Sequence, residues 1–313
     1  MKKLVLILLT LSLFTACENE PLDPDFTEQG GGNNGGNNGG GNQNGGTFAM
    51  SSYTYNKAID TGVGVSTIDT DFSINSSGQI SSQNTRFEFF GAIIDGTAPV
   101  VRDGSGRVIE TSVSDGSGLL STTSIVYNGD NIVQINFVDT QFSEENYTYN
   151  IEHNGNISTR TEVGSTESII YTFDNEDKLI ERETLNNGNS IRIENHSYDS
   201  NNNLISSVMT GDGARTFTYT FDDTTNPVNS LFQDFYKYQL FNDNYDDQFE
   251  HWLVIWGSTN NMVSATTPEG PSDLAITYDS EDRIITRNGS INSALLNAGS
   301  GGITTEEIFT YVN

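Results

Sequence analysis

From residue 47 to 313 the chain is a series of short runs in which apolar and polar residues alternate. Clear examples lie at 86–90, 168–173 and 215–221, and they are rich in Thr, Tyr, Phe and Ile. A period of two is typical of β-strands, and β-branched and aromatic residues favour them. Asn, Asp, Gly and Ser separate the runs, and these residues favour tight turns. The pattern predicts an all-β antiparallel fold.

One motif recurs along this region: an aromatic residue, an acid, polar turn residues and an aliphatic residue. It reads YDSNNNLI at 198–205, FDNEDKLI at 173–180 and YDSEDRII at 278–285, with a degraded copy around Asp103 and Val108. Aromatic residues recur every 22 to 25 positions between Tyr127 and Phe221. That period is one β-hairpin. We expect the aromatic to end a strand, the acid to open the turn and the aliphatic to start the next strand.

This motif resembles the YD, or RHS-like, repeat, which occurs in degenerate form in many surface lipoproteins of Bacteroidota. The resemblance covers roughly residues 100–313. It implies an antiparallel meander of hairpins that forms a curved or partly closed sheet. Toxins of this type carry many more repeats and a cargo domain, neither of which is visible in this sequence. Only the hairpin geometry is therefore carried over.

An aromatic-rich insert at about 222–275 interrupts the repeat. Asn226 can cap a helix and Pro227 fits its first turn. Apolar residues at helical spacing then predict one short helix around 227–238, which plugs one end or one face of the sheet. At 251–256 both alternating sets of positions are largely apolar, which predicts a strand buried on both faces.

The insert also holds the candidates for stacking on a ligand: Tyr236, Tyr238, Tyr245, Trp252 and Trp256. Aromatic rings on a rigid surface can pack against sugar rings. The two tryptophans fit a buried core better, because their neighbours are apolar. The three tyrosines have polar neighbours and are the better candidates for exposed stacking.

The N-terminus predicts where in the cell the protein is located. Two lysines precede an apolar run at 4–14, which is shorter than the roughly 20 residues that span a bilayer. Residues 1–16 therefore fit a cleaved signal peptide. Cys17 is the only cysteine, and it follows the small residues Thr15 and Ala16. This arrangement resembles the lipobox of bacterial lipoproteins, although Phe14 stands where Leu is preferred. The resemblance implies that acyl chains on Cys17 anchor the protein in outer-membrane lipid.

The segment after Cys17 predicts the side of the membrane and the distance from it. Acidic residues at 18–25 resemble the signal that sends lipoproteins of Bacteroidota to the cell exterior; the alternative is a linker facing the periplasm. Residues 30–46 are only Gly, Asn and Gln, which predicts a flexible tether. We thus expect a lipidated N-terminus and tether at 17–46, followed by a single β domain at 47–313.

Charge limits the partners. With 42 acidic and 14 basic residues the formal net charge is −28, which argues against nucleic acid. The acidic run at 242–247 lacks the loop glycine and the closing Glu of an EF-hand, so a solvated loop is favoured over a calcium site. His153, His196 and His251 lack the short spacing of a zinc site. We expect no cofactor.

No catalytic motif stands out. The chain has no G-x-S-x-G elbow and no P-loop, and no feature singles out one pair among its 42 acids. We expect no enzyme. Separately, Asp223-Thr224-Thr225 resembles the Asp-Ser/Thr-X motif for O-glycosylation in Bacteroidota, which makes Thr224 a candidate acceptor. The plain alternative there is an Asx-type turn before the helix.

These observations favour a non-catalytic, lipid-anchored protein of the cell surface that binds or scaffolds an extracellular glycan or protein. Two alternatives stay open. One is a glycan-binding accessory to polysaccharide uptake, which predicts exposed aromatics in a row. The other is a carrier that holds an apolar ligand in a half-barrel, which predicts a dry apolar cavity.

Overall fold

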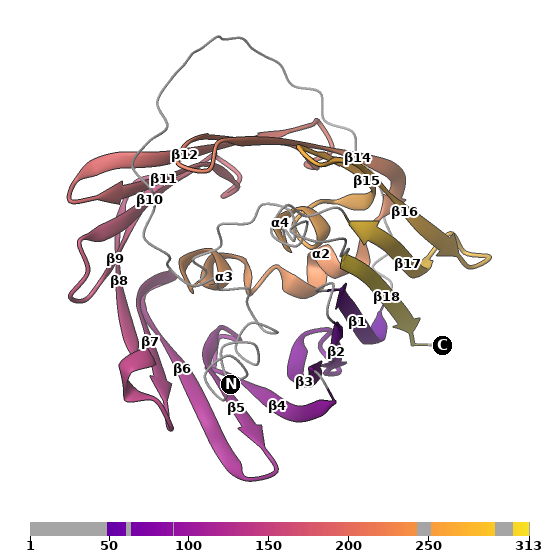
Figure 1. The fold of residues 1–313 in the computed structure, drawn as a ribbon, viewed down its shortest axis with the longest axis horizontal. Helices are drawn as coiled ribbons and strands as arrows, with labels where there is room; N and C mark the ends of the chain where they lie inside the picture. Colours follow the sequence, from indigo (N-terminus) through magenta and orange to yellow (C-terminus); the bar gives the residue numbers. More distant parts are fainter. Residues whose placement is uncertain (1–48, 61–63, 90, 243–251, 292–302, 313) are drawn as a thin grey trace.

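The computed structural model describes residues 49–60, 64–89, 91–242, 252–291 and 303–312. Within these residues, eighteen strands form one antiparallel sheet in which each strand pairs with its neighbours in the sequence. The first strand, β1 (Met50–Asp60), also pairs with the last, β18 (Ile303–Tyr311). The predicted meander is therefore a closed barrel, and the three α-helices of the insert, α2 to α4, lie inside the ring of strands (Figure 1).

The other strands, in chain order, are β2 (Val65–Ile74), β3 (Ile80–Phe89), β4 (Ala92–Arg102), β5 (Val108–Asp115), β6 (Gly118–Asn128), β7 (Asn131–Asp139), β8 (Tyr147–Asn154), β9 (Ile157–Glu162), β10 (Glu167–Phe173), β11 (Leu179–Asn186), β12 (Asn189–Tyr198), β13 (Leu204–Gly211), β14 (Arg215–Thr225), β15 (Asn260–Thr267), β16 (Gly270–Tyr278) and β17 (Ile284–Ile291). The helical segments are η1 (Ser143–Glu145), α2 (Pro227–Phe232), α3 (Tyr236–Asn242) and α4 (Trp252–Ile255).

Strand alternation decides which side chains face the interior. In β18, Ile303, Thr305, Glu307 and Phe309 are buried, whereas the residues between them are exposed. The outer face carries polar pairs instead, such as Thr54 with Asp71, Asn56 with Glu306 and Thr97 with Asn84. The interior thus combines apolar side chains with buried polar groups, and the outer surface carries polar pairs together with exposed apolar residues such as Ile93 and Val126.

The repeat motif forms one defined hairpin turn. Asp199 follows the last residue of β12, and its Oδ1 accepts hydrogen bonds from the N–H groups of Asn201 and Asn203, both at 2.9 Å. Asn202 has a φ of 68°, a conformation that Asn, Asp and Gly tolerate. The same two bonds recur in four further turns among the described residues, which open at Asn75, Asp103, Asp174 and Asp279. The predicted roles of acid and aliphatic residues are confirmed.

The aromatic residue of the motif links one hairpin to the next. The Tyr198 hydroxyl donates to the Leu179 carbonyl oxygen at 2.9 Å, and the Lys178 ammonium lies 5.5 Å from the Tyr198 ring centroid. Tyr127 and Tyr311 repeat this arrangement with arginines at 4.6 and 4.8 Å. Each cation–π contact contributes about 0.5–1 kcal/mol at exposed sites. The repeat therefore encodes contacts between hairpins as well as turns.

The insert between β14 and β15 differs from the prediction. Instead of one helix around 227–238, α2 and α3 form there, separated by residues 233–235. Asn226 does occupy the N-cap position of α2, but its side chain makes no capping bond. Its amide donates to the carbonyl oxygens of Ile255 at 2.7 Å and Ser258 at 3.0 Å. The side chain therefore joins α2 to the end of α4.

The strand expected at 251–256 is also wrong, because residues 252–255 form α4. Burial was predicted correctly: Leu253, Val254 and Ile255 are 2, 1 and 5% exposed. A run that is apolar at every position carries no period, so it cannot distinguish a buried strand from a buried helix. Among the described residues, no helix is long and apolar enough to cross a membrane.

The helices pack against the barrel through aromatic side chains, α3 placing Phe241 against Tyr171 of β10 and α2 forming a second cluster. Phe232 of α2 stacks on Trp256 with ring centroids 4.3 Å apart, and it meets Phe72 edge-on at 5.3 Å. Tyr53 lies beside them, 5.3 Å from Phe72. Burying side chains of this size supplies much of the stability of a core. The insert is thus part of the barrel's core.

Candidate binding site

One end of the barrel gathers the repeat turns. In a meander, the turns that follow even-numbered strands all lie at the same end. We call this end the turn rim; it comprises residues 75–79, 103–107, 128–131, 174–178, 199–203 and 279–283. The insert follows β14 and enters the barrel from the same end. The rim and the insert therefore face each other.

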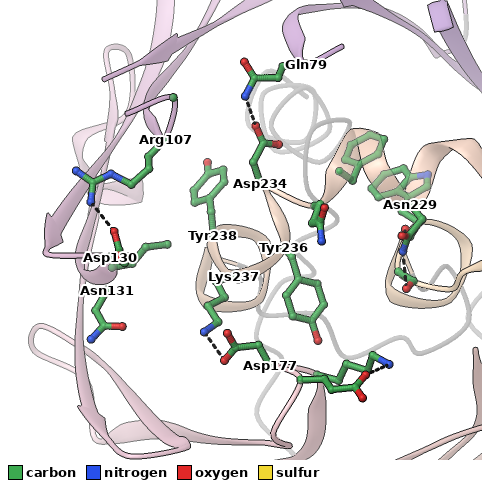
Figure 2. Close-up of a pocket in the computed structure, with 18 of the residues that line it drawn as sticks. Gln79, Arg107, Asp130, Asn131, Asp177, Asn229, Asp234, Tyr236, Lys237 and Tyr238 are labelled. Atoms are coloured by element: carbon green, nitrogen blue, oxygen red, sulfur yellow. Dashed lines mark hydrogen bonds and ion pairs between the residues drawn. The ribbon is translucent and has the colours of Figure 1, made fainter. Parts of the chain in front are cut away.

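A cavity of about 910 Å³ lies between the turn rim and the insert (Figure 2). This volume is within the usual range of ligand-binding cavities. Residues of the rim that border it include Gln79, Arg107, Asp130, Asn131, Asp177, Lys178 and Asn202. Residues of the insert that border it include Asn229, Phe232, Gln233, Asp234, Tyr236, Lys237, Tyr238 and Trp256.

Asp234 joins the insert to the rim. It lies between α2 and α3 and forms an ion pair with Arg102, whose guanidinium also donates to the carbonyl oxygens of Gly106 and Ile80. The Gln79 amide donates to the same carboxylate at 3.4 Å. Figure 2 marks this hydrogen bond with a dashed line. Burial raises the pKa of Asp234, and the nearby Arg102 opposes that rise. These contacts fix the segment between the helices at the cavity wall.

The start of α3 forms a second wall. The Tyr236 hydroxyl accepts a hydrogen bond from the Leu179 N–H at 2.8 Å, and Lys237 pairs with Asp177 at 2.8 Å. The Tyr238 hydroxyl lies 3.5 Å from the Thr111 hydroxyl, and burial raises the pKa of Tyr238 to about 12. The tyrosine hydroxyls are therefore neutral at physiological pH and are bonded to the barrel, which holds the rings in place.

The third wall is formed by α2 and the end of α4. The Trp256 indole N–H donates to the Tyr53 hydroxyl oxygen at 3.1 Å. The Asn229 amide donates to the carbonyl oxygens of Trp256 and Gly257 at 3.3 and 2.8 Å. Trp256 is thus held in three ways: by a hydrogen bond at the indole nitrogen, by a hydrogen bond at its backbone carbonyl and by the Phe232 ring, which covers one face of the indole.

The predicted stacking residues have mixed outcomes. Tyr238 is 1% exposed and Tyr236 is half-buried, so the expectation that they are exposed is wrong. They point into the barrel because α3 packs inside it, which their polar neighbours did not indicate. Trp256 is half-buried beside them. Trp252 lies in α4, but its side chain, like the whole of Tyr245, is outside the described residues. Ligand stacking itself stays a prediction.

Thr224 lies in β14, two residues after Asp222. The Thr224 N–H donates to Asp222 Oδ1 at 3.0 Å, which is the Asx turn considered as the plain alternative. Its hydroxyl donates to Asp222 Oδ2 at 2.9 Å and accepts from the Asn261 amide at 2.8 Å. Glycosylation of Thr224 stays a prediction.

The remaining predicted sites fall largely outside the described residues. These are Cys17, the predicted tether and the acidic positions 243–247. Asn242, expected in the acidic loop, instead ends α3, where it is buried and accepts a hydrogen bond from the Tyr147 hydroxyl at 3.0 Å. In the described part of the chain, no group of three or more His, Cys, Asp or Glu could hold a metal ion.

The sequence did not reveal the polar residues of the cavity. Asn229, Gln233, Asp234 and Lys237 carry no motif, and only a helix over the range 227–238 that contains them was predicted. The rim residues had a usable signal. Gln79, Arg107 and Lys178 each stand four positions after the residue that opens a repeat turn. That position borders the cavity in these three turns, whereas Asn203 and Arg283, at the same position of the other two, are not among its lining residues.

The chain was compared with protein families, with curated proteins and with solved structures. No family model matches the chain, and no curated protein matches it. Among solved structures, it is similar to a porin-like protein from Bacteroides uniformis ATCC 8492, with 12% identity and a TM-score of 0.48 over 85% of this chain and 99% of that one.

Two toxin structures are also similar to parts of the chain. The Photorhabdus luminescens Tc holotoxin pore has 13% identity and a TM-score of 0.26, over 75% of this chain and 11% of that one. The TcdB2-TccC3 structure has 9% identity and a TM-score of 0.21, over 74% and 16%. At these identities and TM-scores we base no functional statement on the likenesses.

Proposed function

We propose that this protein is a non-catalytic, lipid-anchored binding protein on the outer face of the outer membrane, and that its ligand occupies the cavity at the turn rim. The observation that supports this function is the cavity itself. Its walls come from five hairpin turns and from the insert, and both aromatic rings and polar groups line it. Most other inward-facing positions are occupied by packed side chains.

The outer surface supports anchoring by lipid. Asp71, Arg86 and Asp95 are exposed on the neighbouring strands β2, β3 and β4, and Glu306 is exposed on β18; all four face outward. Charged side chains on the lipid-facing surface of a membrane barrel are destabilising. These charges favour a barrel that stands in water and is held to the membrane through acylated Cys17. The acidic residues after Cys17 support the outer face.

The lining does not favour a carrier of an apolar ligand. Such a carrier needs a dry apolar chamber, but Asn229, Asp234 and Lys237 border this cavity. The insert also occupies much of the barrel interior that an apolar ligand would need. A polar or amphipathic ligand suits the site better, because buried polar groups require hydrogen-bonding partners.

Native mass spectrometry of the full-length protein, extracted from the membrane in mild detergent, tests the binding function. We expect a bound small molecule on the wild type. Gln233→Trp, which fills the cavity from an exposed position, should lose it. Asn195→Trp on the outer face is the matched control and should keep it. If the wild type carries no ligand, or if Gln233→Trp retains it fully, the cavity is not the binding site.

Anchoring has a separate test. Cys17→Ser should release the protein from the membrane fraction, and protease added to intact cells should digest the wild type. If Cys17→Ser stays in the membrane, lipid at Cys17 is not the anchor. If the wild type resists protease until the cells are lysed, it does not face the exterior.

A further inference from the structure

Every charged side chain that borders the cavity has a partner of opposite charge: Asp234 pairs with Arg102, and Arg107 lies near both Asp103 and Asp130. Among the described residues, the basic side chains that line it are Arg107, Lys178 and Lys237. Arg107 pairs with Asp103 at 2.6 Å, Lys178 with Glu176 at 3.2 Å and Lys237 with Asp177 at 2.8 Å. A charged ligand would have to compete with these partners, whereas a neutral ligand leaves every pair in place.

The uncharged lining suits hydroxyl groups. Gln79, Asn131, Asn202 and Gln233 border the cavity, and an amide side chain both donates and accepts hydrogen bonds. A sugar hydroxyl does the same. The Gln79 and Asn202 amide nitrogens already donate to Asp234 and Glu176, which leaves their oxygens as acceptors. Asn131 and Gln233 are exposed, and so are available to a ligand.

The aromatic rings supply the apolar half of the same recognition. The Tyr236 and Trp256 rings border the cavity, and each is held by a hydrogen bond to the barrel. Rigid rings lose little conformational entropy on binding and pack against the C–H faces of sugar rings. With about 910 Å³, the cavity has room for several sugar units.

The chain enters the barrel at the same end. Met50, the first residue of β1, pairs with Tyr311, and Ser52 pairs with Ser73, just before the rim turn at 75–79. The predicted tether therefore joins the barrel at the turn rim. A flexible coil of the 31 residues between Cys17 and residue 49, as the sequence predicts, would have a typical end-to-end distance of about 30 Å. The eleven residues of β1 extend about 36 Å. If the rim pointed away from the membrane, the tether would have to run back along the outside of the barrel to reach the membrane. That path is about as long as the typical end-to-end distance of the tether.

We infer that the cavity binds a neutral, hydroxyl-rich oligosaccharide and that its mouth faces the anchoring membrane, where membrane-borne sugar chains are within reach. This inference rests on the proposed function, because it assigns a ligand class to the proposed site and uses the anchor at Cys17. The lining argues for the sugar, and the entry point of the chain independently argues for the direction of the mouth.

Tryptophan fluorescence tests the ligand class. Trp252 and Trp256 are the only tryptophans, so a full-length Trp252→Phe protein reports on the cavity alone. It is titrated with a panel of neutral oligosaccharides, with acidic oligosaccharides and with a fatty acid. We expect a saturable change only with neutral members. Asn131→Ala combined with Gln233→Ala should weaken binding at least tenfold, and Asn195→Ala on the outer face should not.

The results separate the two proposals. If an acidic oligosaccharide or the fatty acid binds in place of neutral sugars, and Gln233→Trp blocks it, the ligand class is wrong but the cavity function stands. If no probe binds and native mass spectrometry also finds no ligand, the proposed function fails.

A separate experiment tests whether the sugar comes from the membrane or from solution. Acylated protein in nanodiscs is compared with and without a glycolipid whose headgroup is the oligosaccharide that binds. We expect the headgroup to shift Trp256 emission as the free sugar does. If only the free sugar acts on the anchored protein, the mouth does not face the membrane.

Discussion

Inside the barrel wall, Arg287 and Glu307 form a buried ion pair that can be tested by substitution. They are 1 and 2% exposed, and two nitrogen–oxygen distances of 2.7 Å join them. The Tyr53 hydroxyl donates to the same carboxylate at 2.6 Å. Burial alone would lower the pKa of Arg287, but the neighbouring Glu307 outweighs it and the pKa is raised. Glu307→Gln removes the negative charge and keeps the shape.

The expected cost is large, because the substitution leaves Arg287 charged and buried without its counter-ion. Breaking a buried pair from one side destabilises a protein by about 3–5 kcal/mol. Removing both charges, with Arg287→Met and Glu307→Gln together, should cost less than the sum of the single changes. We expect a coupling energy of about 2–3 kcal/mol. The exposed pair Arg86–Asp95, with side chains 47 and 69% exposed, should contribute less than about 1 kcal/mol.

Urea unfolding measures these values, provided that circular dichroism and tryptophan fluorescence give coincident transitions. The four proteins of the double-mutant cycle are compared with Asp95→Asn as the control. A loss below about 1 kcal/mol for Glu307→Gln, or a coupling energy near zero, would show that water reaches the pair and that the barrel wall is not closed there.

Three further predictions concern turns and titration. Asp199→Ala should lower the free energy of unfolding by about 2 kcal/mol, because two backbone N–H groups lose their acceptor, and amide hydrogen exchange at the turn should speed up. Ser200→Ala, at an exposed position of the same turn, is the control and should change neither the stability nor the exchange rate. Gly211→Ala should lower the melting temperature more than Gly129→Ala, although both have positive φ, since only at Gly211 would a Cβ lie 2.3 Å from a carbonyl oxygen; equal effects would contradict the geometry. Tyr238 has a folded-state pKa of about 12 against an ordinary value of 10.0, so its protonated hydroxyl stabilises the fold fully below pH 10, and that contribution is lost as pH rises through about 12. A Tyr238→Phe protein should therefore lose less stability than the wild type between pH 10 and about 12. If the two proteins depend on pH in the same way, Tyr238 is not buried as the structure has it.

Much of the fold could be predicted from the repeat. Period-two alternation indicated the strands, and the spacing of Tyr198, Asp199 and Leu204 located the turns, because Asx turns and positive-φ positions are local chemistry. The insert was harder to predict. Residues 252–255 are apolar throughout, and only packing inside the barrel selects a helix there. Tyr238 has polar neighbours in sequence, yet α3 carries it into the interior.

The sequence by itself determined the hairpins and their turns, and it supports the hypothesis of an anchor at Cys17. These depend on short-range preferences, in which each residue acts through its own backbone and its nearest neighbours. Only the tertiary structure decided that β1 meets β18, that the insert lies inside the barrel and that Asn131 and Gln233 face one cavity. Those outcomes depend on contacts between residues far apart in the chain, which no local pattern of residues records.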